Sequence, residues 1–153
     1  MNLDKHIIKE FLSFQKNEIT ESIVYTHLAT IEKDSTNQKI MQQIALEEKQ
    51  HYEVLKCYTG QDIRPDQRRI SKFVWLARLF GVTFAIKLME SSEISSYKGY
   101  ARYPEMADLV RLAQDEEIHE AKLIGLINEE RLEYMWSVVL GLNDALVEFT
   151  GAL

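Results

Sequence analysis

Hydrophobic residues in the first half of the chain recur every three or four positions, the spacing that places side chains on one face of an α-helix. This spacing predicts a first helix over residues 4–33 and a second over residues 35–58. Ser35 or Thr36 is the predicted N-cap of the second helix, because short hydroxyl side chains accept hydrogen bonds from exposed backbone amides. Gly60 is expected to end that helix, since glycine readily adopts the left-handed conformation.

The second half of the chain repeats this layout after a long connection. A polar segment, residues 61–70, leads into a basic and aromatic stretch that is expected to break or bend at Gly81. A third helix is predicted to follow as far as about residue 102, and Pro104 suits the first turn of a fourth helix. Residues 132–153 then form a distinct apolar segment.

Each half of the chain therefore has the pattern of a helical hairpin, and packing the two hairpins together gives the predicted fold. Two antiparallel hairpins joined by a long crossover form an all-α, antiparallel four-helix bundle. We assign residues 1–131 to this bundle and residues 132–153 to an extra C-terminal apolar helix. A chain of 153 residues with 46% hydrophobic residues is long enough for one domain with its own core.

Two Glu-x-x-His pairs interrupt the apolar faces of the second and fourth predicted helices, and a lone Glu interrupts the first and the third. A Glu and a His three positions apart point the same way from a helix, so both can bind one ion. Buried carboxylates are costly unless they are paired or bind a metal. The candidate metal ligands are Glu18, Glu48, His51, Glu90, Glu116 and His119.

The chemistry of these side chains suits iron or manganese, which prefer carboxylate and imidazole ligands. The chain has a single cysteine, Cys57, which excludes a four-cysteine metal site. Zinc could occupy the same ligands. This many ligands at one point predict two metal ions bridged by carboxylates, a geometry that supports two-electron chemistry with oxygen or peroxide.

The net charge and the N-terminal residues limit which binding partners and which cellular compartment are expected. A net charge of −6 argues against nucleic acid as a partner. The first residues contain no long apolar run of the kind found in signal peptides, so a cytoplasmic location is expected. The single cysteine agrees with a reducing compartment.

Three further residues have two interpretations each. Tyr25 falls near the predicted centre, where it either hydrogen-bonds a ligand carboxylate or only packs in the core. Glu21 lies one turn from Glu18 and is either an additional ligand or faces solvent or a neighbouring helix. Glu47 is expected to be solvated or to support one of the ligands.

Four segments that contain the candidate ligands resemble the rubrerythrin branch of the ferritin-like di-iron proteins, over roughly residues 5–130. The segments are Glu18–Tyr25 (EITESIVY), Glu48–His51 (EKQH), Glu90–Glu93 (ESSE) and Asp115–Glu120 (DEEIHE). The resemblance implies a ferritin-like bundle that binds two iron ions through the six candidate ligands. It also implies a seventh ligand, Glu93, because rubrerythrins carry a second Glu three residues after the first on the third helix. The alternative is that Glu93 only accepts a hydrogen bond next to the ligands.

The resemblance implies an oxidoreductase that reduces peroxide or oxygen while ferrous iron is oxidised. Rubrerythrins also carry a rubredoxin domain with Cys-x-x-Cys pairs, which this sequence lacks, so an external electron donor is expected. Three alternative functions also fit the sequence: an iron-binding or iron-delivery module, a di-iron hydroxylase of a lipid quinone, and a helical interaction module without a metal.

Two segments outside the predicted bundle have their own alternatives. The basic and aromatic stretch after residue 70 is interpreted as a crossover helix packed on the bundle, with binding to an anionic membrane surface as the alternative. Residues 141–151 (GLNDALVEFTG) resemble the start of the first membrane helix of the vacuolar iron transporter family. That resemblance implies association with a membrane or a membrane transporter at the cytoplasmic face. The alternative is a fifth helix that covers the bundle or a dimer partner, and a homodimer is expected.

Overall fold

The computed structural model describes residues 4–126 together with Ser137, Leu140 and Gly141, and describes only the backbone of residues 90–98. Residues 4–126 form five α-helices and no strand, which confirms the prediction of an all-α fold. The helices are α1 (Lys5–Ile31), α2 (Ser35–Thr59), α3 (Gln67–Phe80), α4 (Val82–Tyr100) and α5 (Ala107–Ile124).

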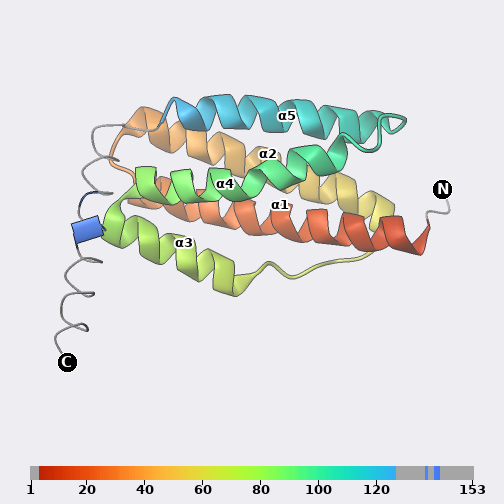
Figure 1. Ribbon diagram of the computed structural model, residues 1–153, viewed down its shortest axis with the longest axis horizontal. Coiled ribbons are helices and arrows are strands. Elements are labelled where there is room, and N and C mark those ends of the chain that lie inside the picture. Colours follow the sequence, from red (N-terminus) through yellow and green to blue (C-terminus); the bar gives the residue numbers. More distant parts are fainter. Residues whose placement is uncertain (1–3, 127–136, 138–139, 142–153) are drawn as a thin grey trace.

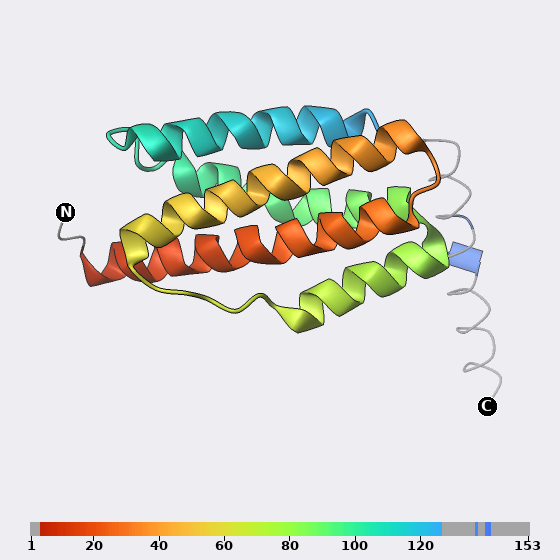
Figure 2. The same ribbon diagram turned by 180° about the vertical axis from the view of Figure 1, so that it is seen from behind.

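Four of these helices lie side by side along the long axis of the molecule, and the shorter α3 lies along one flank (Figures 1 and 2). The short turn after Ile31 makes α1 and α2 an antiparallel hairpin, and α4 and α5 form a second hairpin. An extended connection runs back along α1 before α3 begins, and α3 packs against both α1 and α4. The crossover between the hairpins thus contains a helix of its own.

The ends of α2 have clear physical causes, one of which differs from the prediction. Asp34 is the N-cap, and its carboxylate accepts hydrogen bonds from the backbone amides of Thr36 and Asn37, both at 2.9 Å. The prediction of Ser35 or Thr36 as the cap is therefore wrong, because both already belong to the helix. Gly60 ends α2 with a positive φ of 65°, as predicted.

The second half of the chain confirms the break and corrects one helix start. Gly81 separates α3 from α4 with a φ of 91°, which confirms the predicted break there. The prediction that Pro104 lies in the first turn of the next helix is wrong, because α5 begins at Ala107 after Met106. A tight turn precedes α5, in which the Met106 amide donates a hydrogen bond to the carbonyl of Tyr103.

The core consists of two apolar clusters separated by a polar layer. One cluster gathers side chains from all five helices, including Leu28, Ile44 and Leu123. The other lies towards the opposite end of the same helices and includes Phe11 and Leu112. Along α1, α2 and α5 the chain passes from one cluster to the other through buried Glu and His residues. The polar layer is therefore closed by apolar side chains on both sides.

The predicted C-terminal helix and the boundary at residue 131 lie outside the described residues, apart from Ser137, Leu140 and Gly141, which are helical. Among the residues that the structure describes, no helix is both long and apolar enough to cross a membrane. The predicted association of the C-terminal segment with a membrane or a transporter stays a prediction.

The cap of α2 can be tested with two neighbouring substitutions. Asp34→Ala should lower the free energy of unfolding by about 1 kcal/mol, because two backbone amides lose their acceptor. Ser35→Ala is the matched control and should change it by less than about 0.5 kcal/mol, since Ser35 is exposed and helical. Urea unfolding measures both values, and a larger loss from Ser35→Ala would contradict the assignment of the cap.

Candidate metal centre

The polar layer brings together five of the predicted ligands from three helices. Helix α1 contributes Glu18, α2 contributes the first Glu-x-x-His pair and α5 the second. Four of these side chains are at most 3% exposed, and the side chain of Glu116 is 9% exposed. The five residues are Glu18, Glu48, His51, Glu116 and His119.

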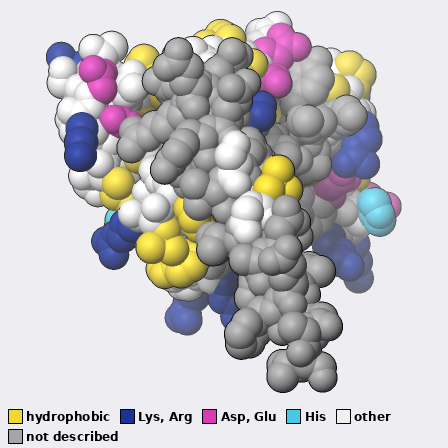
Figure 3. Space-filling model, turned by 60° about the vertical axis from the view of Figure 1, so that its left-hand side comes forward, with side chains coloured by type: hydrophobic (Ala, Val, Ile, Leu, Met, Phe, Trp, Pro, Cys, Tyr) yellow, Lys and Arg dark blue, Asp and Glu magenta, His cyan; other side chains and the backbone are white. Residues whose placement is uncertain are grey.

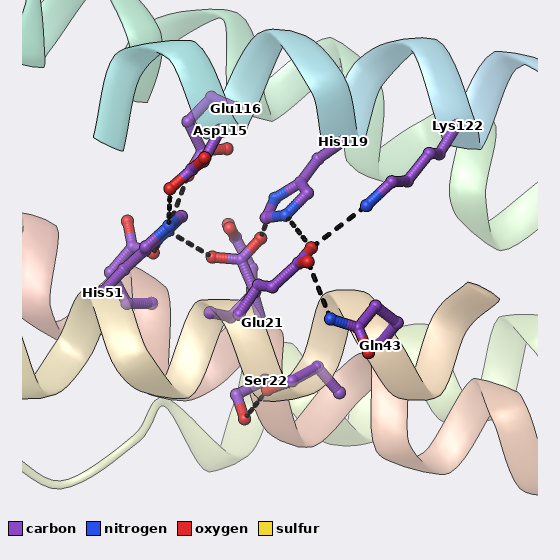
Figure 4. Close-up of polar contacts among 12 residues, drawn as sticks. Glu21, Ser22, Gln43, His51, Asp115, Glu116, His119 and Lys122 are labelled. Carbon is purple, nitrogen blue, oxygen red and sulfur yellow. Dashed lines mark hydrogen bonds and ion pairs between the residues drawn. The ribbon is translucent and has the colours of Figure 1, made fainter. Parts of the chain in front are cut away.

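One imidazole nitrogen lies at the centre of three carboxylates. Nδ1 of His51 is 3.3 Å from Oε2 of Glu18, 3.3 Å from Oε1 of Glu116 and 3.5 Å from Oε2 of Glu48. Figure 4 shows Glu116 reaching down from α5 towards His51. One ligand atom from each of these four residues lies within 4.8 Å of every other, so the four could hold a metal ion.

The second imidazole shares a carboxylate with the first. Nδ1 of His119 is 3.0 Å from Oε1 of Glu48, whose other oxygen faces His51. The two imidazole rings are stacked, with their centroids 5.6 Å apart. Glu48 therefore presents one oxygen to each histidine and links the two Glu-x-x-His pairs.

The second ring nitrogen of each histidine, Nε2, contacts an acidic side chain on the facing helix. Nε2 of His51 is 3.3 Å from Oδ2 of Asp115 on α5, and Nε2 of His119 is 2.6 Å from Oε2 of Glu47 on α2 (Figure 4). An acid at Nε2 keeps a proton on that nitrogen and leaves Nδ1 to face the carboxylates. Lys122 is 3.2 Å from the same oxygen of Glu47 and helps to hold it.

These outer acids reveal a longer repeat than Glu-x-x-His. Glu47 and Asp115 each immediately precede the buried Glu of their own helix, and each contacts the histidine of the other helix. Sequence reasoning left the role of Glu47 open and missed Asp115. The signal was present as an acid before each pair, in Glu47–His51 and in Asp115–His119.

A tyrosine supports the centre, although a different one from the residue singled out in the sequence. The hydroxyl of Tyr100, which is fully buried, donates a hydrogen bond to Oε1 of Glu18. Tyr25 lies in the adjoining apolar cluster at 1% exposure, and its predicted hydrogen bond to a ligand stays a prediction. The approach of Tyr100 to Glu18 depends on how α4 packs against α1, so only the fold shows it.

Glu21 belongs to a different interaction. Its Oε1 lies 2.7 Å from Nη2 of Arg69, so this buried carboxylate ties α1 to the crossover helix α3. The side chains of Glu90 and Glu93 lie outside the described residues, although both positions are within α4. Their predicted roles as ligands stay predictions.

The donor atoms fit a metal ion. Oε2 of Glu48 and Oε1 of Glu116 are buried and have no hydrogen-bond partner among the residues that the structure describes, although both are within ion-pair distance of His51. A buried carboxylate oxygen without a donor costs roughly 1–3 kcal/mol or more, and a cation would remove that cost. Oxygen and imidazole donors are also the set that iron and manganese prefer.

Burial of Glu18 and the contacts of both histidines with carboxylates raise the pKa values of these three side chains in the cluster. Burial, with repulsion from Glu48, raises the pKa of Glu18 to about 8. Burial alone would lower the pKa of His119, but contacts with Glu48 and Glu116 outweigh it and raise that pKa to about 9. The pKa of His51 is raised further, again against burial, by Glu116, Glu18 and Glu48. A metal ion that enters the cluster must therefore displace protons.

Comparison with protein-family models, with curated proteins and with solved structures finds no match to this chain. The resemblance to rubrerythrins accordingly stays a prediction from the motifs. The arrangement of carboxylates and imidazoles in the polar layer is the observation on which a functional assignment depends.

The protons of the cluster predict how the metal-free protein responds to pH. His119 and Glu18 have folded pKa values of about 9 and about 8, above their ordinary values of 6.5 and 4.5. The folding stability that these two side chains contribute is fully present below their ordinary pKa values. It is lost as the pH rises through their pKa values in the folded protein. The melting temperature of chelator-treated protein should therefore fall by at least a few degrees between pH 6.5 and 9.

Glu18→Gln should make that fall smaller, because the glutamine does not titrate. Glu53→Gln, which changes an exposed residue of α2, should leave it unchanged. A melting temperature that rises over the same range, or an equal fall in the Glu18 variant, would contradict the protonation of this cluster.

The outer acids predict a second effect, on metal affinity. Glu47→Gln and Asp115→Asn should each weaken binding of Mn²⁺ about 10- to 100-fold, because each frees the histidine ring on the facing helix. Glu53→Gln and Glu120→Gln remove exposed carboxylates from the same two helices and serve as controls. Calorimetric titration measures the affinities, and unchanged affinity in both outer-acid variants would contradict the role of these contacts.

Proposed function

We propose that the protein is a non-haem di-iron protein of the rubrerythrin-like branch of the ferritin-like proteins. The observation that carries this proposal is the buried cluster of Glu18, Glu48, His51 and Glu116, in which one oxygen of Glu48 and one of Glu116 have no hydrogen-bond partner among the described residues. The side-by-side arrangement of α1, α2, α4 and α5, with a crossover through α3, supports the ferritin-like form of the four-helix bundle (Figure 1).

The residues divide naturally between two ions. Glu18, Glu48, His51 and Glu116 would hold the first ion, since their ligand atoms already lie together. Glu48 and His119 would contribute to the second, with Glu90 and Glu93 of α4 as the proposed remaining ligands. The two oxygens of Glu48 face different imidazoles, which supports its role as the ligand shared by both ions.

Iron is the proposed native metal because the donor set is made of carboxylate oxygens and imidazole nitrogens. Manganese prefers the same ligands, and zinc could bind as an adventitious occupant. The only cysteine of the chain is exposed on α2 and does not take part in the cluster. These ligands therefore favour iron or manganese over an ion that prefers thiolates.

The proposed activity is the oxidation of ferrous iron coupled to the reduction of peroxide or oxygen. Two ferrous ions supply two electrons when bound, which together with two protons convert one peroxide to water. Within the chain, Glu47 and Asp115 orient the histidines, and Tyr100 holds a proton at its hydroxyl next to Glu18. The two apolar clusters exclude bulk water from either side of the layer. An external electron donor is proposed to return the iron to the ferrous state.

Anaerobic loading with ferrous iron, followed by peroxide, tests this proposal. The protein should bind close to two irons per chain by elemental analysis, and one peroxide should be consumed for every two irons oxidised. Glu48→Ala should abolish most of the binding, because it removes the shared ligand. Glu53→Ala is the control, since it removes an exposed carboxylate from the same helix.

The outcomes distinguish the alternative functions. Two bound irons with no repeated turnover of peroxide in the presence of a reductant would contradict the oxidoreductase and indicate an iron-holding module. A folded protein that binds no iron or manganese would contradict the metal centre itself. Equal losses in the Glu48 and Glu53 variants would contradict the assignment of the ligands.

A further inference from the structure

Helix α3 has two chemically different faces. Its inner face consists of Ile70, Phe73 and Ala77, which are at most 6% exposed and pack on the core. Its outer face lies on the opposite side of the helix and carries two large hydrophobic side chains, four residues apart. Trp75 is 60% exposed and Leu79 is 56% exposed. The packing of α3 on α1 and α4 therefore leaves a second apolar stripe facing outwards.

The same outer face is basic. Helix α3 contains four basic residues and no acidic one, in a chain whose net charge is −6. Arg69 turns inwards to Glu21, whereas Arg68, Lys72 and Arg78 are exposed. None of these three exposed side chains forms an ion pair with any residue that the structure describes. We call Arg68, Lys72, Trp75, Arg78 and Leu79 the outer α3 face.

Helix α3 is fixed to the rest of the protein by its own cap, an ion pair and a buried face. Asp66 caps it by accepting hydrogen bonds from the amides of Arg68 and Arg69, at 3.0 and 3.1 Å. The ion pair between Arg69 and Glu21 and the burial of Phe73 fix its inner face to the rest of the protein. Figure 3 shows hydrophobic side chains bordered by Lys and Arg side chains on the side of the molecule that it brings forward.

We propose that the outer α3 face binds the surface of an anionic lipid bilayer. Basic side chains attract acidic headgroups, while Trp75 and Leu79 on the same stripe enter the boundary between headgroups and acyl chains. Long Lys and Arg side chains can keep their charges in the headgroup layer while their stems cover apolar surface. A nucleic acid would use the basic side chains but would leave the exposed Leu79 without a role.

This surface is independent of the metal centre. None of its five residues contacts a candidate ligand among the described contacts, so binding to lipid and binding of metal can be measured separately. The inference also does not depend on residues 132–153, because all its side chains belong to α3.

Vesicle sedimentation with the full chain tests the proposal. The protein should bind vesicles made of equal parts phosphatidylcholine and phosphatidylglycerol, and should bind vesicles of phosphatidylcholine alone much more weakly. Lys72→Glu combined with Arg78→Glu should weaken binding to the anionic vesicles on the order of tenfold or more. Leu79→Ser should weaken it severalfold, because the apolar contact is lost.

Helix α2 provides matched controls. Lys39→Glu combined with Lys49→Glu makes the same change of charge at two exposed positions away from α3. Leu46→Ser removes a side chain of nearly equal exposure, 58%. Both controls should bind the anionic vesicles within about twofold of the parent, and circular dichroism verifies that every variant remains helical.

Tryptophan fluorescence locates the contact. The chain has two tryptophans, so Trp136→Phe leaves Trp75 as the only one. Its emission should shift to shorter wavelength on addition of anionic vesicles and should stay unchanged with neutral ones, because the indole moves from water into the interface.

Several results would overturn the proposal. Equal binding to neutral and anionic vesicles would contradict the role of the basic side chains. Binding that survives the α3 substitutions would place the contact in another part of the chain. Equal losses of vesicle binding in the α2 controls would show that only net charge matters, not the outer α3 face. Tight binding to RNA without binding to vesicles would assign this face to nucleic acid.

Discussion

The burial of three carboxylates beside two imidazoles is the constraint on which the rest of this structure depends. Glu18, Glu48 and Glu116 come from three different helices, and each would repel the others if all were ionised without a counter-charge. The raised pKa values of both imidazoles and of Glu18 favour protonated forms, which would balance this charge in the metal-free protein. Cations would balance it more completely, because they would also satisfy the oxygens that lack donors.

The same layer determines how the helices align. Along α2 the chain passes from one apolar cluster through Glu48 and His51 to the other, and along α5 it passes through Glu116 and His119 in the opposite direction. A slip of α5 by one turn would place Glu116 against an apolar cluster and would separate both histidines from their outer acids. The contacts of Asp115 and Glu47 across the two helices therefore stabilise the alignment that assembles the centre.

The sequence was sufficient to predict the all-α fold and to select five residues that meet in one layer, because helical periodicity and i, i+3 spacing are local properties. It could not show that Asp115 supports His51 or that Tyr100 reaches Glu18, since both contacts depend on how separate helices pack. The choice of Asp34 over Ser35 as the cap depends on which residue leaves the helical conformation, which residue type alone does not decide. The pattern along one helix thus predicts which side chains point into the core, whereas the side chains that they contact on other helices depend on tertiary structure.

Glu18 and Glu21 show how such partners decide the role of a residue. They lie one turn apart on α1 and are almost equally buried, at 0% and 2% exposure, so burial alone does not distinguish them. Helix α3 supplies Arg69 to Glu21, and this ion pair makes Glu21 an anchor for the crossover. Glu18 instead meets His51 and Tyr100, and the cluster of four possible metal ligands to which it belongs contains no arginine or lysine. Because α3 turns one basic residue inwards and leaves three outside, the same helix neutralises one buried carboxylate and gives an acidic protein a basic outer surface.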